Sequence, residues 1–173
     1  MPSIITSPFL DGSPTMLTLS SPRWRELGQA HGSAEDIPRL LEALAAIEDE
    51  RERAELWFGV WATLCPDGPA VTAAYAAVPH LLSIAESRGA PERVSSLHAA
   101  ATVEMNRHLP GAPPIPDDVL HDYALAIESL PRRVAELTSE PWDAAAAQIL
   151  AAALLAGKRQ PQLARSVLTL GED

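Results

Sequence analysis

The sequence predicts an all-α fold. No window shows sustained alternation of apolar and polar residues with β-branched side chains, which is the pattern of a half-buried strand. Apolar residues instead recur every three or four positions, which places them on one face of a helix. Three such stripes stand out: Ile37, Leu40, Leu41 and Leu44; Ala54, Trp57, Trp61 and Leu64; and Val71, Tyr75, Val78, Leu82 and Ala85. Roughly eight helices fit the chain.

Capping residues indicate where the first helices begin. Ser21 followed by Pro22 is typical of an N-cap with proline at the first helical position, and Gly32 can close that short helix. Ser33 with Asp36 offers a variant capping box for the second helix.

Prolines mark the later boundaries. Residues 65–68, CPDG, predict a turn whose glycine has a positive φ. Residues 109–118, LPGAPPIPDD, predict an extended loop that leads into a helix capped by one of the two final aspartates, Asp117 or Asp118. Pro141 and Pro161 each suit the first turn of a helix.

The length and composition predict one globular domain. A chain of 173 residues that is 47% hydrophobic can bury a core, and we assign that domain to residues 21–173. Residues 1–20 lack the layout of a secretory signal and are expected to form a poorly ordered or draped arm. The most apolar stretch, residues 144–157, is shorter than the roughly 20 residues that a bilayer span requires.

The single cysteine bears on location and chemistry. Cys65 cannot form an intramolecular disulfide or a cysteine-based zinc cluster, and it fits the cytoplasm, which we take as the default compartment. It stands at a predicted helix end, where the helix dipole disfavours a thiolate, so we do not expect it to act as a nucleophile.

The chain is acidic. Its formal charge of -10 repels phosphate backbones, which disfavours binding to nucleic acid or to anionic membranes and leaves a basic protein as the favoured partner. The acidic residues cluster at Glu48, Asp49, Glu50, Glu52 and Glu55. The simplest interpretation of that cluster is a solvated helix end or loop.

Three segments share a pattern: IPRLLEALAAI from Ile37, VPHLLSIAESR from Val78 and LPRRVAELTSE from Leu130. Each opens with an aliphatic residue, a proline and a basic or imidazole side chain. Pro79 follows Pro38 by 41 positions and precedes Pro131 by 52. The first spacing lies in the range of about 40 to 47 residues of HEAT and armadillo units. Residues 33–158 therefore resemble HEAT-like repeats, which implies a right-handed α-α superhelix (solenoid) of about three helix pairs.

A narrower resemblance covers the middle of the chain. Trp57, Trp61, Leu64, Gly68 and the segment AAYAAVPHL resemble a poorly characterised bacterial group with a Trp-containing helix, an HQG turn and a SYAAVPHL helix. This chain has Cys-Pro-Asp in the turn and Ala74 in place of the serine. The resemblance implies a helical-repeat fold and interaction roles such as toxin immunity, and it transfers no catalytic residues.

The repeat predicts a row of surface residues. If the units stack in register, Arg39, His80 and Arg132 occupy equivalent positions and form a short basic row on an acidic protein. We therefore count these three as candidates for contacting a partner or ligand. A structural or merely exposed role for His80 is favoured over a catalytic one, because no motif supplies a substrate site or an orienting partner.

Aromatic residues are the other binding candidates. Trp57 and Trp61, with Phe58 between them, could form an aromatic wall, and Tyr75 follows in the next stripe. The spacing of the two tryptophans matches the core stripe, so burial is the favoured interpretation.

No metal or cofactor site is expected. Glu104 with His108 and Asp117 with His121 each have the spacing of two ligands, but neither pair comes with a third ligand, and surface helix pairs explain them better. No phosphate-binding loop, zincin motif, nucleophile elbow or carboxylate pair is present.

We therefore expect a noncatalytic, cytoplasmic protein-protein interaction module, most concretely an acidic antitoxin or immunity protein that binds a basic partner. The alternative is an enzyme or small-ligand-binding protein on a HEAT-like scaffold with a site near His80. HEAT-like DNA glycosylases use basic faces, which this acidic chain does not favour. A third possibility is a homodimer that packs through the alanine-rich segment 144–155, so both monomer and homodimer remain open.

Overall fold

The computed structural model describes residues 16–170 and confirms the all-α class. The helices are α1 (Ile37–Ala46), α2 (Glu50–Leu64), α3 (Thr72–Glu86), α4 (Ala90–Asn106), α5 (Asp117–Glu128), α6 (Leu130–Ala135), α7 (Ala144–Gly157) and α8 (Pro161–Leu168). A short 3-10 helix, η1 (Pro22–Glu26), precedes them. No helix within residues 16–170 has the length and apolar character needed to cross a bilayer.

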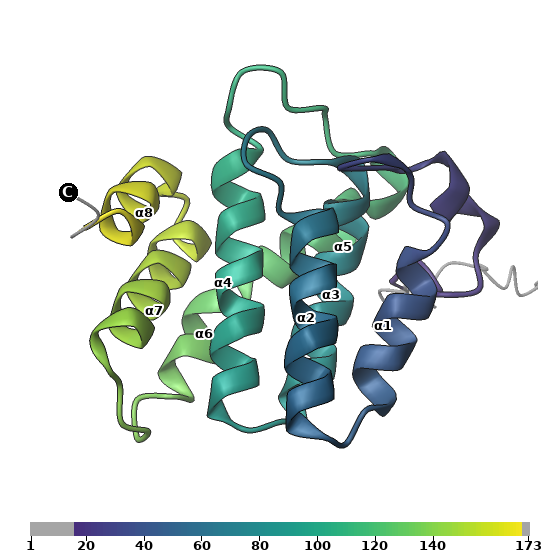
Figure 1. Cartoon of the computed structure of the whole chain (residues 1–173). Helices are drawn as coiled ribbons and strands as arrows, with labels where there is room; N and C mark the ends of the chain where they lie inside the picture. Colours follow the sequence, from purple (N-terminus) through teal and green to yellow (C-terminus); the bar gives the residue numbers. More distant parts are fainter. Residues whose placement is uncertain (1–15, 171–173) are drawn as a thin grey trace, which may run out of the picture.

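The helices pack in two layers (Figure 1). Helices α2, α4 and α7 lie in front and begin at the same lower end of the molecule, whereas α3, α5 and α6 lie behind them. Helix α3 contacts α1, α4 and α5, and helix α7 contacts α4, α6 and α8. These contacts make α3 the centre of one half of the core and α7 the centre of the other.

The segment after η1 differs from the sequence prediction. Ser21 does cap η1, because its hydroxyl accepts a hydrogen bond from the Arg23 amide at 3.2 Å. The helix nevertheless ends at Glu26, and Gly32 lies in a hairpin of two antiparallel strands, β1 (Gly28–Gln29) and β2 (Gly32–Ser33). Two-residue strands are too short to produce an alternating pattern, which explains why the sequence did not indicate them.

The predicted capping box at the start of α1 is wrong. Asp36 is the N-cap residue, but its carboxylate makes no capping hydrogen bond and pairs instead with Arg39. A charged partner three residues away therefore competes successfully with the amides of the first turn.

Later boundaries match the sequence in part. Gly68 has a φ of 131°, as the predicted turn requires, and Pro161 begins α8. The N-cap of α5 is Pro116 rather than an aspartate, and the Asp118 carboxylate binds Arg23 of η1 instead of capping the helix. Pro141 lies before the first turn of α7, which begins at Ala144. The N-cap is Asp143, whose carboxylate accepts a hydrogen bond from the Ala146 amide at 2.7 Å.

The three repeat prolines do not share one position in a helix. Pro38 and Pro131 stand in the first turns of α1 and α6, as expected, but Pro79 lies inside α3, which already begins at Thr72. Every residue from Ala73 to Leu82 is buried, so packing on all sides of α3 stabilises the helix at this interior proline.

The alanine-rich helix α7 packs inside the chain. Its buried face consists of Leu150, Ala152, Ala153 and Ala156, and its neighbours are α4, α6 and α8. At its end, a Cβ on Gly157 would lie 2.5 Å from Pro131 Cδ and 3.0 Å from the Ile127 carbonyl oxygen. The chain's own helices thus cover one face of the alanine-rich segment, whereas Ala144, Ala145 and Leu154 remain exposed.

Candidate functional site

His80 is a structural residue in this fold. Its side chain is buried, with the residue 8% exposed, and its Nε2 atom lies 2.8 Å from the Leu17 carbonyl oxygen. A carbonyl can only accept a hydrogen bond, so Nε2 carries the proton. Burial lowers the pKa of His80, and the Trp24 ring lies 6.1 Å away. His80 therefore fastens residues 17–24, which include part of the predicted arm, to α3; residues 1–15 of that arm lie outside the described residues.

The predicted basic row is not formed. Arg39 and Arg132 are both exposed, and each is paired with a carboxylate on its own helix or next to it, Asp36 and Glu136 respectively. His80 is covered by Leu17 and presents no comparable surface. The expectation of three equivalent surface positions is wrong, because Pro79 places His80 in the buried middle of α3 rather than at a helix start.

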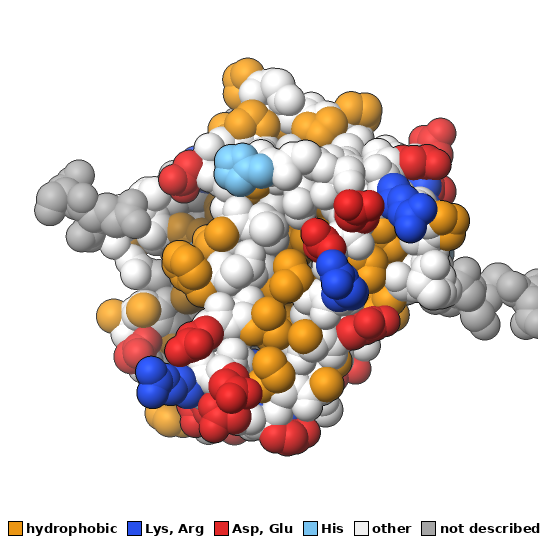
Figure 2. Space-filling view, turned by 45° about the vertical axis from the view of Figure 1, so that its right-hand side comes forward, with side chains coloured by type: hydrophobic (Ala, Val, Ile, Leu, Met, Phe, Trp, Pro, Cys, Tyr) orange, Lys and Arg blue, Asp and Glu red, His pale blue; other side chains and the backbone are white. Residues whose placement is uncertain are grey.

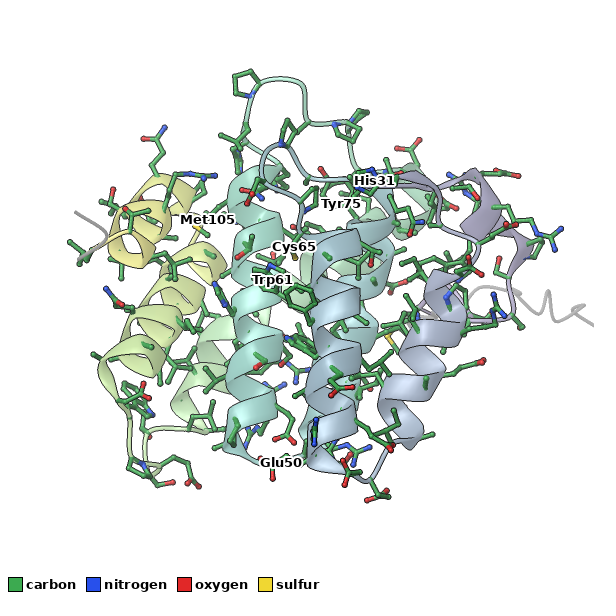
Figure 3. All side chains as sticks on the ribbon, in the orientation of Figure 1. His31, Glu50, Trp61, Cys65, Tyr75 and Met105 are labelled. Carbon is green, nitrogen blue, oxygen red and sulfur yellow. The ribbon has the colours of Figure 1, made fainter. Side chains whose placement is uncertain are left out.

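The two tryptophans are half-buried against the core, which agrees with the favoured interpretation. Trp61 lies between α2 and α4 (Figure 3), and its ring centroid is 4.6 Å from that of His98. Phe58 is 73% exposed and does not join them. Tyr75 is buried, packs edge-on against Tyr123 at 5.1 Å and donates a hydrogen bond to the Pro113 carbonyl. Trp57 lines a pocket.

Of the two pairs with metal-ligand spacing, Glu104 with His108 is structural, and its carboxylate is buried rather than on the surface. The buried Glu104 carboxylate lies 3.3 Å from His108 Nε2, but it also accepts hydrogen bonds from Arg107 and from the Tyr123 hydroxyl. Burial raises the pKa of Tyr123 well above its usual value, so the phenol remains a donor. No cluster of three potential ligands occurs in residues 16–170. Burial also raises the pKa of Cys65 to about 12, which keeps it a thiol.

A pocket of about 180 Å³ lies between α2 and α4, toward the end of the molecule where both helices begin. We call it the α2–α4 pocket. Its apolar lining comes from four helices and consists of Leu44 of α1, Ala54 and Trp57 of α2, Leu81, Ile84 and Ala85 of α3, and Pro91 of α4. Because α1, α2 and α4 surround it and α3 closes it from behind, the pocket depends on the tertiary packing of all four helices.

Two arginines hold the walls of this pocket together. Arg53 pairs with Glu92 of α4 and donates hydrogen bonds to the carbonyl oxygens of Ile47 and Glu48, just after α1. Arg88 donates to the Ala45 carbonyl in the last turn of α1. Cations are favourable at a helix C-terminus, where carbonyl groups lack intrahelical partners. The Arg53 guanidinium is therefore engaged by the protein itself, whereas the buried Nε of Arg88 has no hydrogen-bond partner within residues 16–170.

Acidic side chains are concentrated at the end of the molecule where α2 begins, and one of them, Glu50, lines the pocket. Glu48, Asp49, Glu50, Glu52 and Glu55 are all exposed, as the sequence predicted for a solvated helix end. Asp49 caps α2 by accepting a hydrogen bond from the Glu52 amide at 2.9 Å, and acidic residues in a first turn suit the helix dipole. Glu50 lies at the lower end of α2 (Figure 3). Figure 2 shows acidic side chains crowded at this lower end, next to hydrophobic ones.

The chemistry of the pocket suits binding. Its polar lining groups are Glu50, Arg53, Arg88, Glu92 and Ser95, and the Ser95 hydroxyl donates to the Pro91 carbonyl at 3.0 Å. No nucleophile and base face each other among these groups. Apolar walls with a few polar groups are typical of sites that hold an apolar group. The sequence did not predict this pocket, because Leu81, Ile84 and Arg88 follow the ordinary spacing of residues along a buried helix. That spacing does not indicate a cavity.

The chain matches no protein-family model, no curated protein and no solved structure.

Proposed function

We propose that this protein is a noncatalytic protein-protein interaction module that binds an apolar side chain of a basic partner in the α2–α4 pocket. The observation that carries the proposal is the apolar pocket itself, which lies beside a concentration of exposed carboxylates. A side chain buried in such a pocket supplies binding energy, and the surrounding carboxylates favour a partner of opposite charge.

The charge of the whole chain supports the same class of partner. A formal charge of -10 attracts basic proteins over distances comparable to the Debye length, which accelerates their encounter. The most concrete form of the proposal is an antitoxin or immunity protein that binds a basic toxin.

The proposal also covers the type of helical fold that carries the pocket. We regard α1 with α2, α3 with α4, and α5–α6 with α7 as three units of a HEAT-like solenoid. In support, α3 contacts both α1 and α5, and α4 contacts α7, so that successive units are neighbours. Stacked helix pairs offer an extended surface for a partner without any catalytic machinery.

A small-molecule site near His80 is the weaker alternative. The imidazole is covered by Leu17 and Trp24, and it does not line the α2–α4 pocket. The function we favour therefore places binding at the α2–α4 pocket instead.

A matched pair of variants tests the proposal. Ala54 is exposed and lines the pocket, whereas Ala62 is exposed on the same helix and does not line it. We expect the wild-type protein and the Ala62→Trp variant to recover a stoichiometric basic protein from the cells that produce this chain. The Ala54→Trp variant, whose indole fills the pocket, is expected to lose that partner.

Quantitative mass spectrometry measures how much of the partner each of the three proteins captures. Equal recovery of the partner by Ala54→Trp would show that the pocket is not the binding site. Recovery of a small molecule alone, with no protein partner in any of the three samples, would contradict the interaction function.

A further inference from the structure

A second pocket lies next to the first. It has a volume of about 320 Å³ and lies between the first turn of α4 and the start of α7. Its apolar lining includes Pro91 and Val94 of α4, Leu137, Trp142 and Ile149. We call it the Trp142 pocket.

The two pockets share one wall. Pro91 lines both of them, so they flank the first turn of α4 on opposite sides. Because both pockets are lined by residues near the starts of α2, α4 or α7, both lie toward the lower end of the molecule, where these helices begin (Figure 1). A partner segment lying across the α4 turn would meet both.

Trp142 has the properties of a binding residue. The residue is 41% exposed, yet its indole N–H donates a hydrogen bond to the Leu137 carbonyl at 2.9 Å, which fixes the ring in place. Pro141 stiffens the backbone directly before it. A fixed, exposed tryptophan in a pocket loses little conformational entropy on binding, which is why such residues dominate interface energies.

The charges around the second pocket are also acidic. Glu140 and Asp143 line it, and no basic residue does. The basic side chains nearby are already engaged, since Arg53 pairs with Glu92 and Arg93 with Glu136. Glu50 and Glu140, one at each pocket, form no ion pair within residues 16–170.

We propose that the two pockets form one docking surface for a basic amphipathic helix of the partner, with one apolar side chain in each pocket. Apolar side chains two helical turns apart are separated by about 10 Å, which is close to the diameter of the α4 turn that divides the pockets. Lysine or arginine residues between them would face the carboxylates. This inference rests on the proposed function and specifies the partner's binding element.

A designed peptide provides the probe. The peptide is a helix of about 15 residues with leucines two turns apart and lysines on the flanking positions, and its counterpart replaces every lysine by glutamate. A third peptide keeps the lysines but has only one leucine. Binding to the full-length protein is measured by isothermal titration calorimetry at low and at high salt.

Matched variants report on each pocket separately. Ala54→Trp blocks the α2–α4 pocket, and Ala145→Trp blocks the Trp142 pocket, because both alanines are exposed lining residues. Ala62→Trp and Ala144→Trp are controls at exposed, non-lining positions on the same two helices. Circular dichroism melts establish that all four variants fold.

We expect each blocking variant to weaken binding of the two-leucine lysine peptide by about tenfold, while the controls stay within about twofold of the wild type. We also expect the one-leucine peptide to bind about tenfold more weakly and the glutamate peptide not to bind. If only Ala54→Trp weakens binding, the two-pocket surface is wrong while the proposed function stands. If the glutamate peptide binds equally well, or if neither blocking variant has an effect, both are overturned.

Discussion

At the scale of single residues, Gly157 illustrates a constraint that the sequence did not reveal. It ends α7 where that helix meets the junction of α5 and α6, and the Ile127 carbonyl and the Pro131 ring leave no space for a methyl group. We expect Gly157→Ala to lower the free energy of unfolding by about 1–3 kcal/mol, because a clash in a packed core must be relieved by moving backbone.

Gly59 supplies the control for this prediction. It lies inside α2 with no atom near the position of an added Cβ, so Gly59→Ala should raise stability by up to about 1 kcal/mol through helix propensity. Urea unfolding of both variants measures the difference. Equal effects of the two substitutions would show that α7 does not pack as closely against α5 and α6 as described.

His80 makes the stability depend on pH. Its pKa is lowered from 6.5, mainly by burial, against the opposing effects of the Leu17 carbonyl and Asp122. The unfolded chain therefore binds a proton more readily than the native protein, so the native state loses stability as the pH falls below about 6.5. Burial also lowers the pKa of His98, which packs against Trp61, so His98 likewise makes the native state less stable at low pH.

We expect His80→Gln to reduce the loss of stability between about pH 7.5 and pH 5.5, because the unfolded variant no longer gains that proton. Urea unfolding across this interval measures the slope for the wild type and the variant. An identical slope in both proteins would mean that His80 titrates as it does in the unfolded chain.

At the scale of elements, an ion pair joins three helices at the α2–α4 pocket. Arg53 of α2 binds Glu92 of α4 and the carbonyl groups just after α1, and its side chain is largely buried. We expect Arg53→Gln and Glu92→Gln each to destabilise the protein, with a coupling between them of about 1 kcal/mol in a double-mutant cycle. Additive effects would show that the pair contributes no net stability of its own.

The helices themselves could be predicted where the apolar residues keep helical spacing over several turns. The stripe from Ile37 to Leu44 became α1, and the stripe from Val71 to Ala85 became α3. The predicted caps failed where an arginine competed for the aspartate, as when Asp36 paired with Arg39 three residues away and Asp118 paired with Arg23 of η1. The second pairing is long-range and leaves no local signal in the sequence.

At the scale of the whole molecule, the candidate site depends on how helix ends come together. The sequence predicted Trp57 as a candidate and the acidic cluster as a solvated helix end, and Trp57 and Glu50, one member of that cluster, line the α2–α4 pocket. It did not predict that Pro91 and Trp142 would lie beside them, because these residues are brought to one end only by the antiparallel packing of the helices. The predicted site near His80 failed because residues 17–24 cover that part of α3.

The most direct measurement of the central claim is an amide-resolved NMR titration of the isotope-labelled protein with the two-leucine lysine peptide. The account predicts that the largest chemical-shift changes occur in the first turns of α2, α4 and α7 and in the last turn of α3. Changes concentrated instead around Leu17 and His80, or spread evenly over the acidic surface, would contradict it.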